Sequence, residues 1–225
     1  MTPPITVPYL AIEGNIGAGK TTLSSMIARD YGRRLILEQF DDNPFLPHFY
    51  REPERYAFPV ELFFMTERHK QLQRELGQST LFEQGGVVSD YFFDKTTLFA
   101  RNNLGDDEFR LFQRLHGALA GHFPPPDLLV YLFRPVEVLL DQIARRGRDY
   151  EAEIGADYLR GIQRAYLDYF QLRREGATLV INLEDADFIR DPTVYQQLLE
   201  LLADSDRVGY QRVNWKTGAP EAYPG

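Results

Sequence analysis

Cysteine is absent from the 225-residue sequence, which excludes disulfide bonds, thiolate metal sites and cysteine nucleophiles. Long apolar runs are absent as well: no stretch approaches the ~20 residues that span a bilayer, and the start lacks the basic-then-apolar pattern of a secretion signal. Positive charge is in deficit, with 25 Lys and Arg against 33 Asp and Glu and a net charge of −8. This balance disfavours a protein that coats a nucleic-acid polymer or binds an anionic membrane. We therefore expect a soluble, cytoplasmic protein with neither as its partner.

What the sequence has is enough apolar material for a core, since 44% of its residues are hydrophobic and 13% are aromatic. Short apolar runs alternate with longer segments of helical periodicity. This alternation predicts an α/β fold, with a parallel sheet flanked by helices on both faces. The five expected strands are residues 7–13, 35–38, 87–90, 127–133 and 178–182. We expect a single domain over residues 1–203 and a loosely attached C-terminal tail over 204–225.

A glycine-rich segment after the first expected strand decides the class of fold. Residues 14–21 read G-N-I-G-A-G-K-T, which fits the P-loop pattern G-x-x-x-x-G-K-[ST]. The glycines let backbone N–H groups wrap a polyphosphate, Lys20 bridges the β- and γ-phosphates, and the Thr21 hydroxyl ligates Mg²⁺. A chance glycine turn is the alternative, but an apolar strand precedes the segment and a helix-forming stretch follows it. The sequence predicts a P-loop kinase fold that holds ATP and Mg²⁺ through Gly14, Asn15, Ile16, Gly17, Ala18, Gly19, Lys20, Thr21 and Thr22.

Two further charged groups favour a small-molecule kinase, and the guanine-reading N-K-x-D of GTPases is missing. Glu38 ends the second expected strand, where a carboxylate can accept the proton of an attacking hydroxyl. The alternative for Glu38 is a surface acid that closes a strand. Arg146 and Arg148 follow the fourth strand and its helix, where cations can form a short lid over a transferring phosphoryl group. A favourable interaction with the helix dipole is the alternative for these arginines.

Several motifs, in this order along the chain, resemble the deoxynucleoside kinase family, in particular its bacterial deoxyguanosine and deoxyadenosine kinases. The resemblance spans residues 9–188, and its carriers are A-I-E-G-N-I-G-A-G-K-T-T at 11–22, N-P-F-L at 43–46, Tyr50 with P-E-R-Y at 53–56, L-F-A at 98–100, P-D-L at 126–128 and R-G-R at 146–148. It implies ATP- and Mg²⁺-dependent phosphorylation of the 5′-hydroxyl of a deoxynucleoside, in nucleotide salvage. It also implies a homodimer packed through the helices after the second and third strands.

The resemblance implies roles for single residues. Glu38 looks like the family's general base, and Tyr50 and Glu151 look like the pair that holds the 3′-hydroxyl. Arg146 and Arg148 look like the lid arginines that stabilise the charge of the transition state. The other implied site residues are Arg68 in the base pocket, Asp90 beside Mg²⁺, and a loop that holds the donor adenine, made of Glu184, Asp185, Ala186, Asp187 and Phe188. Phe40 is an aromatic residue that we expect to line the base pocket.

Three positions depart from the family pattern. Tyr91 stands where members carry an arginine that binds phosphate and positions the base carboxylate, and Lys95, one helical turn later, is the candidate to restore this charge. Gln142 replaces an arginine one turn before the lid, where neighbouring Arg145 is the candidate substitute. Glu61 occupies the place of the glutamine that reads the nucleobase.

These departures leave three functions in competition. The first is the kinase described above; the second is a kinase-derived binding or structural subunit with little turnover, which Tyr91 and Gln142 favour. The third is a nucleoside-monophosphate kinase, which would need further cations for the phosphate of its acceptor. Because an ionised carboxylate only accepts hydrogen bonds, Glu61 predicts a preference for deoxyguanosine over deoxyadenosine. The alternative is that Glu61 simply pairs with Arg68.

Overall fold

The computed structural model describes residues 4–39, 43–76, 85–120, 123–204 and 207–221. Its centre is a six-stranded sheet in the order β2-β3-β1-β4-β5-β6, with parallel pairing between all neighbours. The predicted α/β fold with helices on both faces of a parallel sheet is confirmed. The strands are β1 (Tyr9–Gly14), β2 (Arg34–Ile36), β3 (Val87–Ser89), β4 (Leu128–Phe133), β5 (Ala177–Asn182) and β6 (Tyr210–Asn214).

The predicted number of strands is one short, because the sixth lies in the segment expected to be a loose tail. β6 pairs with β5 over five residue pairs, from Thr178–Tyr210 to Asn182–Asn214. Beyond it the chain turns back, and the N–H of Glu221 donates to the carbonyl of Arg212 at 2.9 Å. The expectation of loose attachment is therefore wrong for residues 210–214. Their sequence, Y-Q-R-V-N, lacks the continuous apolar run of a central strand, as befits an edge strand with one neighbour.

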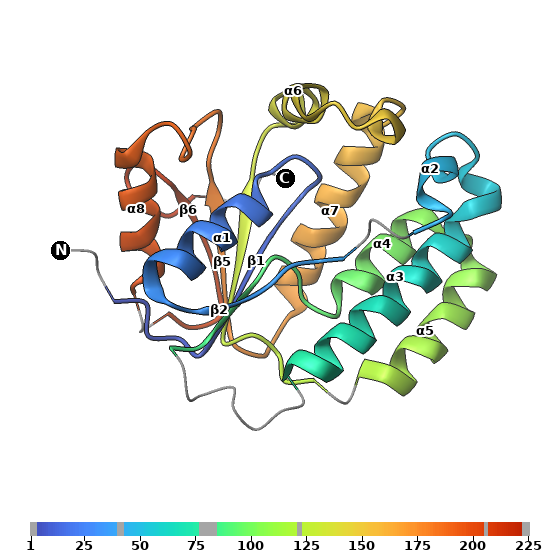
Figure 1. Ribbon diagram of the computed structural model, residues 1–225, viewed down its shortest axis with the longest axis horizontal. Coiled ribbons are helices and arrows are strands. Elements are labelled where there is room, and N and C mark those ends of the chain that lie inside the picture. Colours follow the sequence, from blue (N-terminus) through green and yellow to red (C-terminus); the bar gives the residue numbers. More distant parts are fainter. Residues whose placement is uncertain (1–3, 40–42, 77–84, 121–122, 205–206, 222–225) are drawn as a thin grey trace.

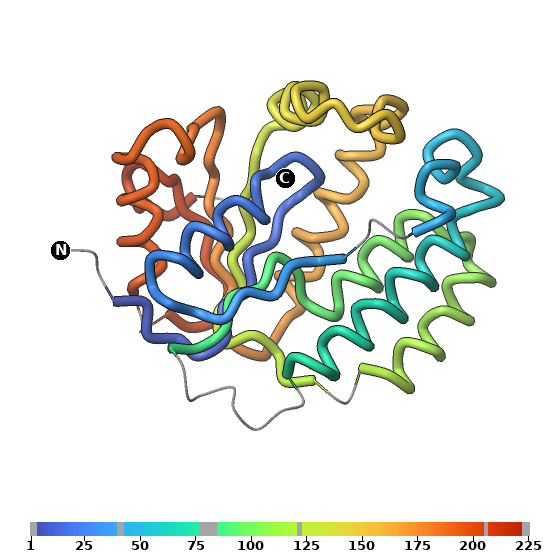
Figure 2. Tube along the Cα trace, viewed as in Figure 1, coloured from blue at the N-terminus to red at the C-terminus, as the bar shows by residue number. Residues whose placement is uncertain are grey.

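Helices form a layer on each side of the sheet (Figure 1). On one side α1 (Lys20–Tyr31), α6 (Val136–Arg146) and α8 (Pro192–Leu202) contribute to one apolar core, through residues such as Leu23, Leu139 and Leu198. The other side holds α3 (Pro53–Leu76), α4 (Lys95–Asn103), α5 (Asp106–Ala120) and α7 (Ala156–Leu172), which share the second core with residues such as Met65, Phe112 and Phe170. Figure 2 shows α3, α4 and α5 side by side. Two short elements complete the described helices, α2 (Leu46–Phe49) and a 3₁₀ turn η1 (Asp149–Glu151).

The P-loop is the turn from β1 to α1, and its conformation requires glycine. Gly17 and Gly19 have φ of 84° and 98°, a region that L side chains rarely adopt. A Cβ atom on Gly19 would also lie 2.9 Å from the ring of Phe188, and one on Gly17 would lie 2.9 Å from the carbonyl of Leu139. The chain therefore reverses here with its backbone against two other segments.

The parallel sheet places several predicted site residues at one edge. Parallel strands end on the same side, so the P-loop after β1, Glu38 beyond β2 and Asp90 after β3 lie together at the carboxyl ends of the strands. None of the described helices has the length and apolarity needed to cross a membrane.

Candidate active site

A pocket opens at the carboxyl ends of the strands, where ligands of parallel α/β sheets bind. It collects predicted site residues from six separate segments of the chain. They are Ile16, Gly17, Lys20, Thr21, Glu38, Tyr50, Glu61, Arg68, Asp90, Arg146, Arg148 and Glu151. The predicted residues Gly14, Asn15, Ala18, Gly19 and Thr22 belong to the same P-loop turn without lining this pocket. Phe40 lies outside the residues that the structure describes.

One end of the pocket lies beside the P-loop, where the sequence predicts phosphate binding, and we term it the phosphate end. It is organised around Lys20, Thr21 and Asp90. The ammonium of Lys20 donates to the carbonyl of Asn15 at 3.0 Å, so it lies across its own loop. Burial, with the like charge of Lys95, lowers the pKa of Lys20 to about 8. The hydroxyl of Thr21 donates to Asp90 Oδ2 at 2.5 Å, and the N–H of Glu38 donates to Asp90 Oδ1 at 2.7 Å. Asp90 thus ties the P-loop to the segment that carries Glu38.

The contact between Thr21 and Asp90 fits a magnesium site. It brings a hydroxyl and a carboxylate oxygen together beside the P-loop lysine. Mg²⁺ prefers hard oxygen ligands, takes few of them from protein, and completes its shell with water and phosphate oxygens. Within the described chain no group of three or more His, Asp or Glu gathers as an all-protein metal cage.

Glu38 is held by two cations in the middle of the pocket. Arg68 donates to its Oε1 through Nε at 2.8 Å and Nη2 at 2.5 Å, and Lys95 donates to its Oε2 at 2.7 Å. Burial opposes the ionisation of Glu38, but the charges of Arg68 and Lys95 outweigh it and hold the pKa of this carboxyl well below its usual value. Glu38 is therefore a carboxylate across the whole physiological pH range.

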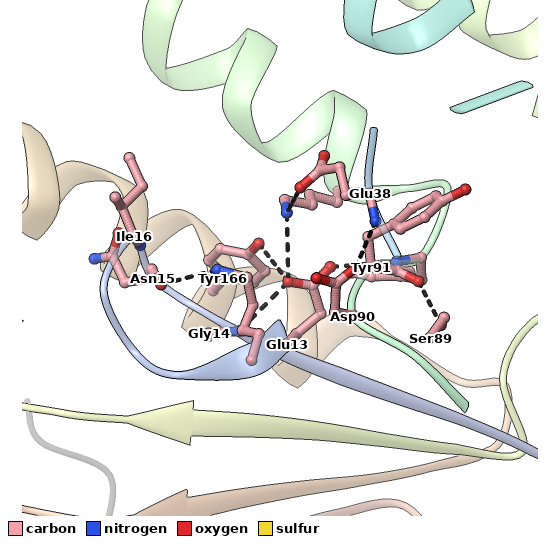
Figure 3. Close-up of polar contacts among 12 residues, drawn as sticks. Glu13, Gly14, Asn15, Ile16, Glu38, Ser89, Asp90, Tyr91 and Tyr166 are labelled. Atoms are coloured by element: carbon pink, nitrogen blue, oxygen red, sulfur yellow. Dashed lines mark hydrogen bonds and ion pairs between the residues drawn. The ribbon is translucent and has the colours of Figure 1, made fainter. Parts of the chain in front are cut away.

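A second carboxyl, Glu13, lies beneath this cluster at the end of β1. Its side chain is completely buried, and it accepts from the hydroxyl of Tyr166 at 2.9 Å and from the N–H of Phe92 at 3.2 Å. Figure 3 shows Glu13, Glu38 and Asp90 converging from neighbouring strand ends. Burial raises the pKa of Glu13, and Lys95, 3.9 Å away, acts against this shift. The sequence signal was a carboxyl inside an apolar strand directly before the P-loop.

The two arginines that are predicted to form the lid share one buried acid. Arg146 donates to Glu151 through Nη2 at 2.6 Å and Nε at 3.0 Å, and Arg148 donates to the same carboxylate at 3.4 Å. The side chain of Glu151 is 5% exposed, whereas those of Arg146 and Arg148 are 37% and 35% exposed. Glu151 thus anchors two cations that still reach solvent at the mouth of the pocket.

The predicted adenine loop, residues 184–188, lies next to the P-loop through the contact of Phe188 with Gly19. The residue that joins the two is Arg134, which the sequence pattern did not reveal. Its guanidinium donates to the carbonyls of Ala18 at 3.3 Å, Glu184 at 3.1 Å and Ala186 at 2.7 Å. Arg134 directly follows β4, so the only sequence signal was a cation at a strand end.

The other end of the pocket is apolar and aromatic around a single carboxyl, Glu61. Glu61 is 2% exposed, and its Oε1 accepts from Asn103 Nδ2 at 2.6 Å. Burial raises the pKa of Glu61 to about 7, although Arg68 and the Asn103 hydrogen bond act against this shift. The walls are Leu46, Phe49, Val60, Phe64, Phe99 and Tyr158. Arg68 hydrogen-bonds to Glu38 and to Thr96, the latter at 2.9 Å, and its charge also acts on Glu61.

Comparison with known proteins gives the same family that the sequence motifs resemble. The sequence model of one family, deoxynucleoside kinase, matches residues 10–205. The chain is 30% identical to a deoxyguanosine kinase of Bacillus subtilis (strain 168) over 197 residues, which cover 86% of this chain and 95% of the relative.

The chain belongs to the deoxynucleoside kinase family.

One further relative and one solved structure are also similar to this chain. A deoxyadenosine/deoxycytidine kinase of the same Bacillus strain is 28% identical over 203 residues, which cover 86% of this chain and 91% of that protein. Among solved structures, deoxyadenosine kinase from M. mycoides with bound dATP has a TM-score of 0.71 and 21% identity, and the match covers 85% of this chain and 97% of that one. This structural likeness supports the shared fold, and the family makes the chain an enzyme of the phosphotransferase class.

The structure places Tyr91 and Gln142, the residues expected to depart from the family pattern, and Lys95, the expected substitute. Tyr91 is fully buried, and its hydroxyl donates to Gln71 at 2.7 Å, away from the pocket. Lys95, the candidate to restore the charge, lies in the pocket and bonds to Glu38. Gln142 lies beside Gly17, at the back of the P-loop turn.

Proposed function

We propose that this kinase transfers the γ-phosphoryl group of ATP to the 5′-hydroxyl of a deoxynucleoside. The observation that carries the proposal is that one pocket holds the P-loop lysine Lys20, the half-buried carboxylate of Glu38 and an apolar, aromatic end. In the reaction the 5′-oxygen forms a bond to the γ-phosphorus as the bond to the β-phosphate oxygen breaks. The hydroxyl proton passes to Glu38, and ADP leaves.

Glu38 suits this role because its charge and direction are fixed. Arg68 and Lys95 hold it ionised, so it is always able to accept a hydrogen bond from the sugar hydroxyl. A base of such low proton affinity takes the proton late, as the new phosphorus–oxygen bond forms, which agrees with the loose transition state of phosphoryl transfer. Positioning of the hydroxyl is then the main contribution of Glu38.

The charge that develops on the phosphoryl oxygens is met by Lys20 and the lid arginines Arg146 and Arg148. Thr21 and Asp90 would hold Mg²⁺, which supplies further charge neutralisation at the phosphates when bound. Because Glu151 already fixes Arg146 and Arg148, little side-chain entropy is lost when they engage the phosphates. The same anchoring keeps Glu151 beside Tyr50, in agreement with their expected contact to the 3′-hydroxyl.

The presence of Lys95 favours an active kinase over a nucleotide-binding subunit with little turnover. The subunit hypothesis rested on Tyr91 and Gln142, which stand where the family pattern has arginines. The ammonium of Lys95 donates to the carboxylate of Glu38 at 2.7 Å, and Glu38 is the carboxylate that the family's arginine is expected to position. The positioning that the missing arginine provides in the family thus has a substitute in this chain.

For the substrate we propose a purine deoxynucleoside, with deoxyguanosine preferred. Guanine offers the ring N–H and the exocyclic amine side by side, and an ionised Glu61 accepts from both. Adenine presents an unprotonated ring nitrogen to the carboxylate, which repels it. Relatives with purine substrates, such as the Bacillus deoxyguanosine kinase, support this proposal.

One assay separates the three candidate functions. The purified protein is given ATP, Mg²⁺ and each deoxynucleoside or nucleoside monophosphate in turn, and ADP production is followed. We expect turnover with deoxynucleosides, highest with deoxyguanosine. Turnover only with monophosphates, or none above the ATPase background, would replace the proposed function by one of its two rivals.

We also propose that two copies of the chain associate through α3 and α5. Two large apolar side chains four residues apart on α5 are exposed, Leu111 at 48% and Leu115 at 38%. Burial of such pairs between helices is a common source of dimer stability. Light scattering tests this proposal. We expect the mass of a dimer for the wild type and the mass of a single subunit for the double variant Leu111→Glu/Leu115→Lys.

A further inference from the structure

Glu61 brings a carboxyl to the base end of the pocket, and its two oxygens are not equivalent. Oε1 accepts a hydrogen bond from Asn103 Nδ2 at 2.6 Å, and the same amide nitrogen lies 3.4 Å from the hydroxyl of Tyr158. An oxygen that already accepts a short N–H bond is a poor place for a proton. When Glu61 is neutral, its proton therefore sits on Oε2.

The neutral acid has the hydrogen-bonding pattern of a glutamine. Oε1 remains an acceptor through its second lone pair, and Oε2–H becomes a donor. This pattern pairs with the amine and ring nitrogen of adenine or cytosine. The ionised form has two acceptors and pairs with the two adjacent donors of guanine. The gain or loss of one proton on Glu61 therefore changes which nucleobase its hydrogen-bonding groups can pair with.

We propose that Glu61, positioned by Asn103, selects the nucleobase according to its own protonation, so that the preference of this kinase moves from adenine or cytosine towards guanine as the pH rises. The inference rests on the proposed function and adds to it that pH determines which nucleobase the site prefers. Asn103 is a positioning residue, because it contacts Glu61 and fixes which oxygen carries the proton.

The surroundings of Glu61 place its titration in a useful range. Burial raises its pKa to about 7. The charged groups that face it are Arg68 on the same helix, Glu38 beyond β2 and Lys95 on α4, and Glu38 stays ionised at this pH. The hydroxyls of Tyr50 after α2 and Tyr158 on α7 face it as well, and burial keeps the pKa of both tyrosines above the usual value.

The test is the ratio of kcat/KM for deoxyguanosine to that for deoxyadenosine, measured from pH 6 to pH 8. Groups that serve both substrates, such as Lys20 with its pKa of about 8, cancel in this ratio. If one proton on Glu61 decides between the bases, the ratio changes by about tenfold per pH unit, or about 100-fold over this range. A ratio constant within about twofold, with turnover of deoxynucleosides intact, overturns the selector and leaves the proposed function standing. Failure of the function itself would appear as no turnover with any deoxynucleoside.

Two variants define the roles of the pair. Glu61→Gln carries the neutral pattern at every pH, so we expect a ratio that favours deoxyadenosine and does not change with pH. Asn103→Leu removes the donor that favours the ionised form. We expect the pH at which kcat/KM for deoxyguanosine falls to move upwards by about one unit. A purely structural role of Asn103 would lower kcat/KM for both nucleosides equally without moving this pH, and that result would overturn the positioning role.

Binding by the wild-type protein tests the same idea without any substitution. Calorimetry at pH 7 in buffers of different ionisation enthalpy counts the protons exchanged on binding. We expect deoxyguanosine to release protons and deoxyadenosine to take them up. Equal proton exchange for the two nucleosides would overturn the proposal.

Discussion

The two ends of the pocket are built in different ways. The phosphate end comes mainly from one continuous segment, residues 14–22, whose backbone conformation is set by its glycines. The base end draws side chains from positions between Glu38 and Tyr158, carried on separate strands and helices. In the proposed function the backbone N–H groups and Lys20 of this one segment bind the phosphates, whereas the base end depends on which side chains from separate elements pair with which. We therefore expect a single substitution at the phosphate end to abolish most of the turnover, whereas a single substitution at the base end should change substrate preference or stability by a smaller amount.

The largest effect is expected at the phosphate end, from Lys20→Ala. Removal of the ammonium leaves the developing charge between the phosphates unmet, and we expect kcat to fall by about 10³-fold or more. Calorimetry should show deoxynucleoside binding unchanged, because the base end is built separately. Lys70→Ala on α3 is the matched control, since the Lys70 side chain is exposed and forms an ion pair with Glu67 at 2.6 Å. Normal turnover of a folded Lys20→Ala variant would contradict the phosphate site.

Glu38→Gln tests the point where the two ends meet. The variant keeps the shape of the side chain but loses the proton acceptor and one negative charge between Arg68 and Lys95. We expect kcat to fall by about 10²-fold or more, with nucleoside affinity retained. Steady-state kinetics measure the loss, and Glu67→Gln, an exposed change on α3, serves as the control. Near-wild-type turnover would show that another group accepts the proton.

The next effect is on stability, at Glu61. Its folded pKa of about 7 lies above the ordinary value of 4.5, so the stability that its neutral form provides is complete below pH 4.5 and is lost as the pH rises through 7. Glu61→Gln avoids this loss. We expect the variant to gain about 2–3 kcal/mol relative to wild type at pH 8 and little at pH 4.5, as measured by denaturant unfolding. A difference that does not change with pH would show that Glu61 ionises without cost in the folded protein.

The smallest effect is expected at Arg134, which links the P-loop to residues 184–188. Arg134→Met removes the link between the P-loop and residues 184–188. We expect KM for ATP to rise about tenfold, with KM for the nucleoside and kcat little changed. The exposed Arg29→Met on α1 is the control. An equal rise in both KM values would place Arg134 in general stability instead of donor binding.

The sequence by itself determined the parallel α/β fold, the P-loop and the family, because each depends on local patterns. Apolar strands, the glycines at 17 and 19, and a lysine followed by threonine act through neighbouring backbone. The position of Glu38 at a strand end was also predictable, since parallel strands place their carboxyl ends at one edge. Among the strands that the structure describes, β6 is the one that the sequence did not predict. It is an edge strand of mostly polar residues, and its stability comes from pairing with β5.

Tertiary structure alone decided which charges meet. Arg68 and Lys95 are 27 positions apart, and both reach Glu38, because α3 and α4 pack side by side over the same strand ends. Asn103 and Glu61 meet for the same reason, 42 positions apart in sequence. No local pattern encodes such pairs, since the distance and burial that fix their energies arise only when the helices have packed.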